Sequence, residues 1–97
     1  MALNARQLKF LRQLAQQRKP VVSVGNRGLT AAVMAEIHTA LNAHELLKIK
    51  LPAAEREARV ELFTRICAES AAEPVQHIGR MAILYRPGEK PKIQLPT

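Results

Sequence analysis

Residues 21–30 read Val21-Val22-Ser23-Val24-Gly25-Asn26-Arg27-Gly28-Leu29-Thr30. The run begins with an apolar strand, continues as a Gly-x-x-Gly loop and ends at the first cap of a helix. Two glycines three positions apart let the backbone turn sharply, because neither carries a Cβ atom. The unpaired N–H groups at the start of the following helix are suited to a phosphate. We therefore predict that this loop holds a nucleic-acid backbone and that the rest of the chain presents it.

The segments on either side of the loop predict a strand, a helix and a second strand. Residues 21–24 are short and apolar, and are expected to form a buried strand away from the edge of a sheet. Thr30 is a suitable N-cap for a helix that extends to about residue 43. Lys48 and Lys50 alternate with apolar residues, which predicts a strand with one basic face. Strand, helix and strand at this spacing form a βαβ unit, so the two strands should be parallel.

An amphipathic helix is predicted before this unit, over residues 4–17. Asn4 can cap it, and Gln7 can reach back to complete a capping box. One apolar stripe predicts the face that packs on the domain. That stripe consists of Leu8, Leu11, Leu14 and Ala15. Arg6, Lys9 and Arg12 lie off the stripe and give the helix a basic solvent face.

The second half of the chain predicts a third helix, a hairpin and a tail. The helix covers residues 53–71, with a buried stripe that includes Val60 and a solvated acidic to mixed face. Strands over 74–78 and 81–86 are joined by a tight turn and should form a hairpin. The predicted fold is a single α/β domain of order α-β-α-β-α-β-β, with a four-stranded mixed sheet. Residues 1–86 form this domain, and residues 87–97 form a basic, Pro-containing tail, on which Lys90 and Lys92 are expected to be flexible until a nucleic acid orders them.

Composition limits the class of protein. The 97 residues suffice for one domain, and the single cysteine excludes an internal disulfide and fits a reducing compartment. Apolar runs stay well short of the ~20 residues of a membrane span. The start of the chain lacks the apolar centre of a signal peptide. We therefore expect a cytoplasmic protein.

Positive charge is concentrated near the N-terminus. The formal net charge is +7, and residues 1–28 carry six basic side chains and no acidic one. Residues 53–72 carry a small excess of acid instead. Such an uneven distribution is typical of a protein that binds a polyanion. A merely solubilising basic surface is the alternative interpretation.

No arrangement of residues favours an enzyme. The three histidines are scattered outside any metal-binding spacing, and Cys67 falls on a predicted buried stripe, where an inert thiol is expected. The glycine loop lacks the Lys-Ser/Thr of a nucleotide-binding P-loop. We expect no catalytic residue, metal, cofactor, membrane contact or small-molecule substrate. A protein-interaction adaptor and a general nucleic-acid-binding protein are the alternatives that stay open.

Five sequence blocks occur in a characteristic order along the chain. They are Lys19-Pro20-Val21-Val22, Gly25-Asn26-Arg27-Gly28-Leu29-Thr30, His44-Glu45-Leu46, Lys48-Ile49-Lys50 and Leu84-Tyr85-Arg86-Pro87. Taken together, these blocks resemble the bacterial YhbY family of stand-alone CRM (chloroplast RNA splicing and ribosome maturation) domains. The resemblance covers practically the whole chain. It implies an RNA-binding protein that associates with ribosomal RNA in precursors of the large (50S) subunit, as a factor in ribosome biogenesis. It also implies a fold like the C-terminal domain of translation initiation factor three, in which the fourth strand runs antiparallel to the other three.

The residues expected to contact RNA come from five parts of the chain. They are Gly25, Asn26, Arg27 and Gly28 of the loop, Arg18 and Lys19 before it, Arg6, Lys9 and Arg12 of the first helix, Lys48 and Lys50, and Arg86. Glu45 is interpreted as structural, pairing with a neighbouring Lys or Arg, and Arg80 as structural in the hairpin turn. Aromatic residues for base stacking are scarce, so binding should depend on phosphates and RNA shape, and hence on salt.

Overall fold

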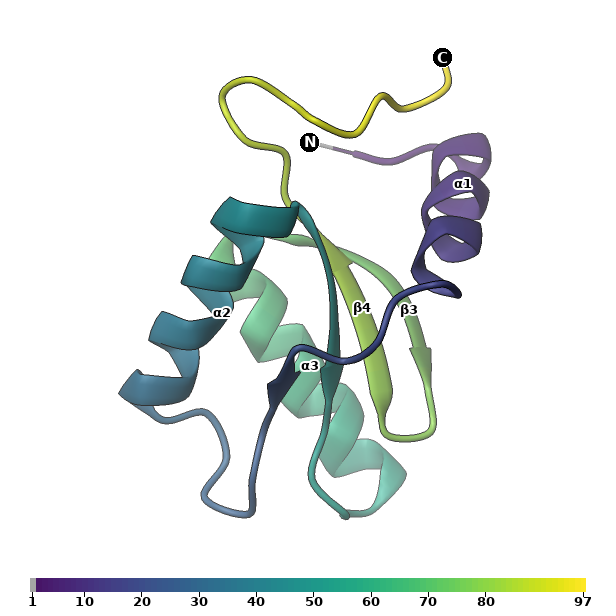
Figure 1. The fold of residues 1–97 in the computed structure, drawn as a ribbon. Helices are drawn as coiled ribbons and strands as arrows, with labels where there is room; N and C mark the ends of the chain where they lie inside the picture. The colour runs from purple at the N-terminus through teal and green to yellow at the C-terminus, as the bar shows by residue number, and fades with distance from the viewer. Residues whose placement is uncertain (1) are drawn as a thin grey trace.

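The fold was obtained as a computed structural model, which describes residues 2–97. Within that range three helices and four strands alternate in the predicted order (Figure 1). They are α1 (Ala5–Ala15), β1 (Val22–Ser23), α2 (Ala31–His44), β2 (Leu46–Lys50), α3 (Arg56–Ser70), β3 (Glu73–Ile78) and β4 (Met81–Tyr85). None of the helices in residues 2–97 is long and apolar enough to cross a lipid bilayer.

The strands form one mixed sheet in the order β1-β2-β4-β3. β1 runs parallel to β2, with Val22 opposite Ile49. β4 runs antiparallel to β2 on one side and to β3 on the other. The predicted parallel pair, the hairpin and the single reversed strand are therefore confirmed.

Helices cover the two faces of the sheet unequally. α2 and α3 lie side by side on one face, and α1 covers part of the other, which we call the α1 face (Figure 1). Alternation along β2 sends Leu47 and Ile49 into the core beneath α2 and α3, while Leu46 packs beneath α1. Lys48 and Lys50 point to the α1 face by the same alternation. Because α1 is short, the sheet beside these lysines is left without a covering helix.

The predicted caps are present at both helices for which they were proposed. Gln7 N–H donates to Asn4 Oδ1 at 2.8 Å, and Asn4 N–H donates to Gln7 Oε1 at 3.1 Å, so the capping box is complete. Val33 N–H donates to Thr30 Oγ1 at 3.2 Å. The apolar stripe of α1 is also confirmed, since Leu11 and Ala15 are fully buried. These local signals fix where each helix begins.

Two expectations about burial are wrong. β1 is an edge strand, and Val21 beside it is 60% exposed, although Val22 and Val24 are buried as predicted. An apolar edge is tolerated here because β1 is only two residues long. Val60 was placed on the buried stripe of the third helix but is 43% exposed. α3 instead buries the stripe of Phe63, Ile66 and Cys67.

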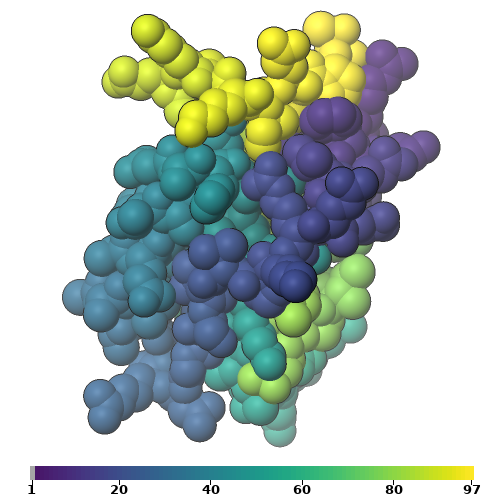
Figure 2. All heavy atoms as spheres, viewed as in Figure 1, coloured from purple at the N-terminus to yellow at the C-terminus, as the bar shows by residue number. Residues whose placement is uncertain are grey.

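The C-terminal segment is folded against the domain, which corrects the expectation of a flexible tail. Figure 2 shows it lying over one end of the molecule, against α1. Ile93 and Leu95 pack with the apolar cluster beneath α1. Arg6 Nη1 donates to the carbonyl of Thr97 at 3.1 Å. Residues 92–97 therefore belong to the folded structure.

Candidate nucleic-acid interface

The Gly-x-x-Gly loop is a tight turn that leads directly into α2. Gly28 N–H donates to the carbonyl of Gly25 at 3.0 Å, which closes the turn. Gly28 has a φ of +75°, a conformation that favours glycine over residues with a Cβ atom. Thr30 then caps α2 through Val33 N–H, and the first two helical residues, Ala31 and Ala32, are exposed next to the loop. The loop and the helix start thus form one set of hydrogen-bond donors.

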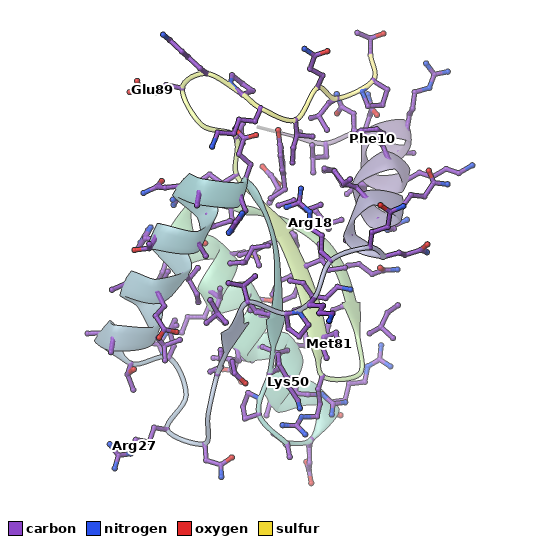
Figure 3. All side chains as sticks on the ribbon, in the orientation of Figure 1. Phe10, Arg18, Arg27, Lys50, Met81 and Glu89 are labelled. Atoms are coloured by element: carbon purple, nitrogen blue, oxygen red, sulfur yellow. The ribbon has the colours of Figure 1, made fainter. Side chains whose placement is uncertain are left out.

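The fold does not require glycine at position 25. Its φ lies outside the left-handed region, and a Cβ atom placed there would meet no atom within 4 Å from residues 2–97 beyond its two neighbours in the chain. Asn26 and Arg27 at the tip are exposed, and Figure 3 shows Arg27 pointing away from the body of the protein. No hydrogen bond within residues 2–97 occupies the Arg27 guanidinium. The backbone at Gly25 and the side chain of Arg27 are therefore accessible to an approaching anion.

Lys48 lies next to the linker between α1 and β1, and Lys50 lies opposite Ser23 of β1. Arg18 in that linker donates from Nη1 to the carbonyl of Leu46 at 2.9 Å, which fixes the linker across β2. Lys19 is exposed. Figure 3 places Arg18 and Lys50 on the same face of the sheet. The structure therefore brings together four of the predicted basic residues, Arg18, Lys19, Lys48 and Lys50, on the α1 face.

Basic residues of α1 extend this face only in part. Arg12 Nε donates to the carbonyl of Val75 at 3.3 Å, and Arg12 and Lys48 both line a hollow of about 280 Å³ on the sheet. Lys9 is exposed, and Arg6 is engaged with the C-terminal Thr97. α1 and the glycine loop lie at opposite ends of the molecule, whose longest dimension is 38 Å. The predicted surface is thus a long band rather than one compact patch.

Arg86 lies apart from that band. Its guanidinium donates to His38 Nδ1 at 3.0 Å, to the carbonyl of Ser70 at 2.7 Å and to Asn42 Oδ1 at 3.0 Å. These contacts join α2 to the end of α3 on the face opposite α1. We assign Arg86 to the packing of the helices and leave it out of the surface proposed below. Arg80 likewise has a local structural contact, from Nε to the carbonyl of Leu51 at 3.0 Å.

Glu45 is structural as predicted, but its partners are backbone groups of the tail. Its buried carboxylate accepts hydrogen bonds from Gly88 N–H at 2.7 Å and from Lys92 and Ile93 N–H, each at 2.9 Å. Burial by itself would raise the pKa of Glu45, but these three donors and the Lys92 ammonium hold it below its usual value. Sequence gave one hint, an acidic residue directly before an apolar strand. The N–H donors are more than forty positions away, so the partners of Glu45 could not be predicted from the sequence.

Among the remaining reactive side chains, the Cys67 thiol is buried and the His77 ring is partly exposed. Burial raises the pKa of the Cys67 thiol to about 12, with Glu73 nearby adding to the effect, so the thiol is protonated near neutral pH. His77 Nε2 lies 3.0 Å from the carbonyl of Gly79, and its ring packs against Phe63. Within residues 2–97, no three His, Cys, Asp or Glu side chains are grouped to hold a metal ion.

Aromatic rings are withdrawn from the surface. Tyr85 and Phe63 are buried, and Phe10 is half-buried against the cluster beneath α1. The α1 face therefore offers cations and aliphatic side chains to a ligand. It lacks the stacked aromatic platform on which many single-strand binders rely.

The family model and the similar proteins agree on one family for this chain. The family model described as the CRS1 / YhbY (CRM) domain matches residues 3–86. A Haemophilus influenzae protein named RNA-binding protein is 48% identical over 97% of this chain and 95% of its own length. A Pseudomonas aeruginosa protein named a probable RNA-binding protein is 45% identical over 98% of this chain and 91% of its own. A Staphylococcus aureus protein of known solution structure superposes with a TM-score of 0.84 at 29% identity, over 98% of this chain and 100% of that one.

Proposed function

The chain belongs to the CRS1/YhbY (CRM) domain family, and on that premise we propose that it binds RNA along the α1 face and the Gly-x-x-Gly loop. The names of its relatives support RNA as the ligand. We choose this surface because several basic side chains on it have no partner among the described residues. Lys19, Lys48 and Lys50 make no side-chain hydrogen bond or ion pair within residues 2–97.

The loop supplies a second kind of contact. Backbone N–H groups at a helix start bind phosphate without reading sequence, because they are fixed in position and the helix dipole favours negative charge. Gly25 leaves room for a phosphate to approach the main chain, and Arg27 can close over it. With aromatic rings buried, affinity would come chiefly from phosphate contacts. RNA is then recognised by the spacing of its phosphates over this band.

The proposed role is that of a ribosome assembly factor without catalytic activity, acting in the cytoplasm. Resemblance to the YhbY group supports ribosomal RNA in precursors of the large subunit as the target. A chain with these contacts would stabilise one arrangement of immature RNA and leave when the mature surface forms. Catalysis is not needed for such a role.

Gly25→Asp tests the proposal, because it introduces a carboxylate at the point of phosphate approach without backbone strain. We expect affinity for purified large-subunit ribosomal RNA to fall roughly tenfold, about 1.4 kcal/mol. In a sucrose gradient, the wild-type protein should sediment with large-subunit precursors and the variant should not. Circular dichroism should be unchanged, since the new Cβ atom meets no atom within 4 Å in the described part of the chain other than those of its two chain neighbours.

Ala58→Asp is the matched control, because it adds the same charge at an exposed position of α3 on the opposite side of the sheet. Full affinity in Gly25→Asp would contradict a role for the loop. Sedimentation with precursors despite lost RNA affinity would favour the protein-interaction adaptor. RNA binding without sedimentation would retain the RNA-binding function and remove the ribosomal role.

A further inference from the structure

A basic hollow of about 520 Å³ lies where the α1–β1 linker, the end of α2, β2 and the C-terminal tail meet. We call it the cationic hollow. Four basic side chains from three segments line it, together with His44, and no acidic side chain of residues 2–97 does so. The four are Arg18, Lys19, Lys48 and Lys92. Like charges gathered in one hollow repel one another, and a bound anion would relieve that repulsion.

The basic side chains of the cationic hollow are held in place by hydrogen bonds and still have N–H groups available to a ligand. Arg18 employs Nη1 for the carbonyls of Leu46 and His44, at 2.9 and 3.4 Å, which leaves its other N–H groups free. Lys92 Nζ donates to the carbonyl of Ala43 at 3.3 Å and has two further hydrogens. These contacts also satisfy carbonyl oxygens at the end of α2, which would otherwise repel an anion.

Lys92 is brought to the hollow by Glu45. Both Lys92 N–H and Ile93 N–H donate to Glu45 Oε1 at 2.9 Å, so the buried carboxylate fixes the backbone on either side of the lysine. Lys92 also lies beyond residues 3–86, the part of the chain matched by the family model. Lys90, two positions earlier, is exposed and does not line the hollow.

We propose that the cationic hollow binds an internal phosphodiester of an RNA strand, with Lys92 as a ligand from the tail and Glu45 as the residue that positions it. The proposal rests on the RNA-binding function proposed above. An internal phosphate is favoured over a terminal one because the cationic hollow adjoins two other depressions of the surface. It shares Val21, Ala43 and His44 with a groove between β1 and α2, and Lys48 with the hollow on the sheet. A strand can therefore enter on one side and leave on the other.

The test compares Lys92→Ala with Lys90→Ala in the full chain. Each variant removes one positive charge from the same tail, so net charge is matched. Binding of fragments of large-subunit ribosomal RNA is measured over a range of salt concentrations. Lys92→Ala should weaken binding severalfold and reduce the slope of log K against log salt by about 0.7 to 0.9, the loss of one phosphate contact. Lys90→Ala should change neither quantity.

Glu45→Gln gives a second readout that simple destabilisation would not produce. If Glu45 positions Lys92, then Lys92→Ala should cost less affinity in the Glu45→Gln chain than in the wild type. Should that variant fail to fold, the two lysine variants still decide the question. Phosphatase treatment of the fragments should leave the effect of Lys92→Ala intact, whereas its disappearance would overturn the internal phosphodiester.

Equal affinity and equal salt slopes in the two lysine variants, with wild-type RNA binding intact, would overturn this inference and leave the proposed function standing. A wild-type chain that does not bind the fragments would overturn both. The two failures are thus distinguished by the wild-type measurement.

Discussion

Glu45 ends α2 with a φ of +63° and places its carboxylate among three backbone N–H groups of the tail. Hydrogen bonds to a charged group contribute more than neutral ones, and a buried donor left without a partner is costly. We expect Glu45→Gln to lower the free energy of unfolding by about 1–3 kcal/mol, because one amide oxygen replaces two charged acceptors. Urea unfolding monitored by circular dichroism measures this change.

The same residue predicts a pH dependence. The pKa of Glu45 is lowered in the folded chain, so the folded state binds a proton less readily than the unfolded state. Its contribution to stability is therefore complete above the unfolded pKa of about 4.3 and is lost as pH falls below that value. Glu45→Gln should flatten the acid limb of the stability curve. Glu89→Gln, at an exposed tail position, is the matched control; equal flattening in both would contradict the assignment.

Single residues could be predicted from sequence only where their partners are close along the chain. Asn4 and Thr30 were identified as caps because a cap bonds to N–H groups within the next turn. Gly28 was identified by its place in a turn. The partners of Glu45 and Arg86 are separated from them by up to 48 positions, and only the folded chain brings them together.

At the scale of elements, the tail behaves as part of the domain. Removal of residues 88–97 would take away every hydrogen bond that the Glu45 carboxylate accepts from the tail, and the packing of Ile93 and Leu95. We expect the free energy of unfolding to fall by several kcal/mol, on the order of 3, from lost burial and an unsatisfied carboxylate. Denaturant unfolding of the truncated chain tests this, and an unchanged midpoint would show that the tail contributes nothing.

Element order and type were predictable because each helix and strand has its own period and boundary signals. Two features were not. The position of β1 at the sheet edge depends on where the other strands pair, which an apolar run of four residues does not reveal. The docking of the tail depends on the Glu45 carboxylate at the end of α2 and on contacts with α1, all distant along the chain. Proline and lysine in residues 87–97 suggested a free segment, and tertiary contacts overrode that composition.

For the whole molecule, the fold converts an uneven charge along the chain into two different faces. The cations of the linker and of β2 meet on the α1 face. On the other side of the sheet lies α3, in which three glutamates are balanced by three arginines (Figure 1). Sequence predicted the charge imbalance and most of the residues of the band. It did not predict that the glycine loop and α1 lie at opposite ends, because that separation follows from the sheet between them.

This separation of charge predicts that position, and not net charge, determines RNA affinity. Lys50→Ala and Arg56→Ala each remove one positive charge, from the α1 face and from the start of α3 respectively. Screening limits the reach of a surface charge to about 8 Å at physiological salt, whereas the domain is 23 Å across its shorter dimensions. Lys50→Ala should therefore reduce the salt slope of RNA binding by about 0.7 to 0.9, while Arg56→Ala should leave it nearly unchanged. Equal effects of the two substitutions would mean that RNA responds to the overall charge of the protein, and would remove the reason for assigning it to the α1 face.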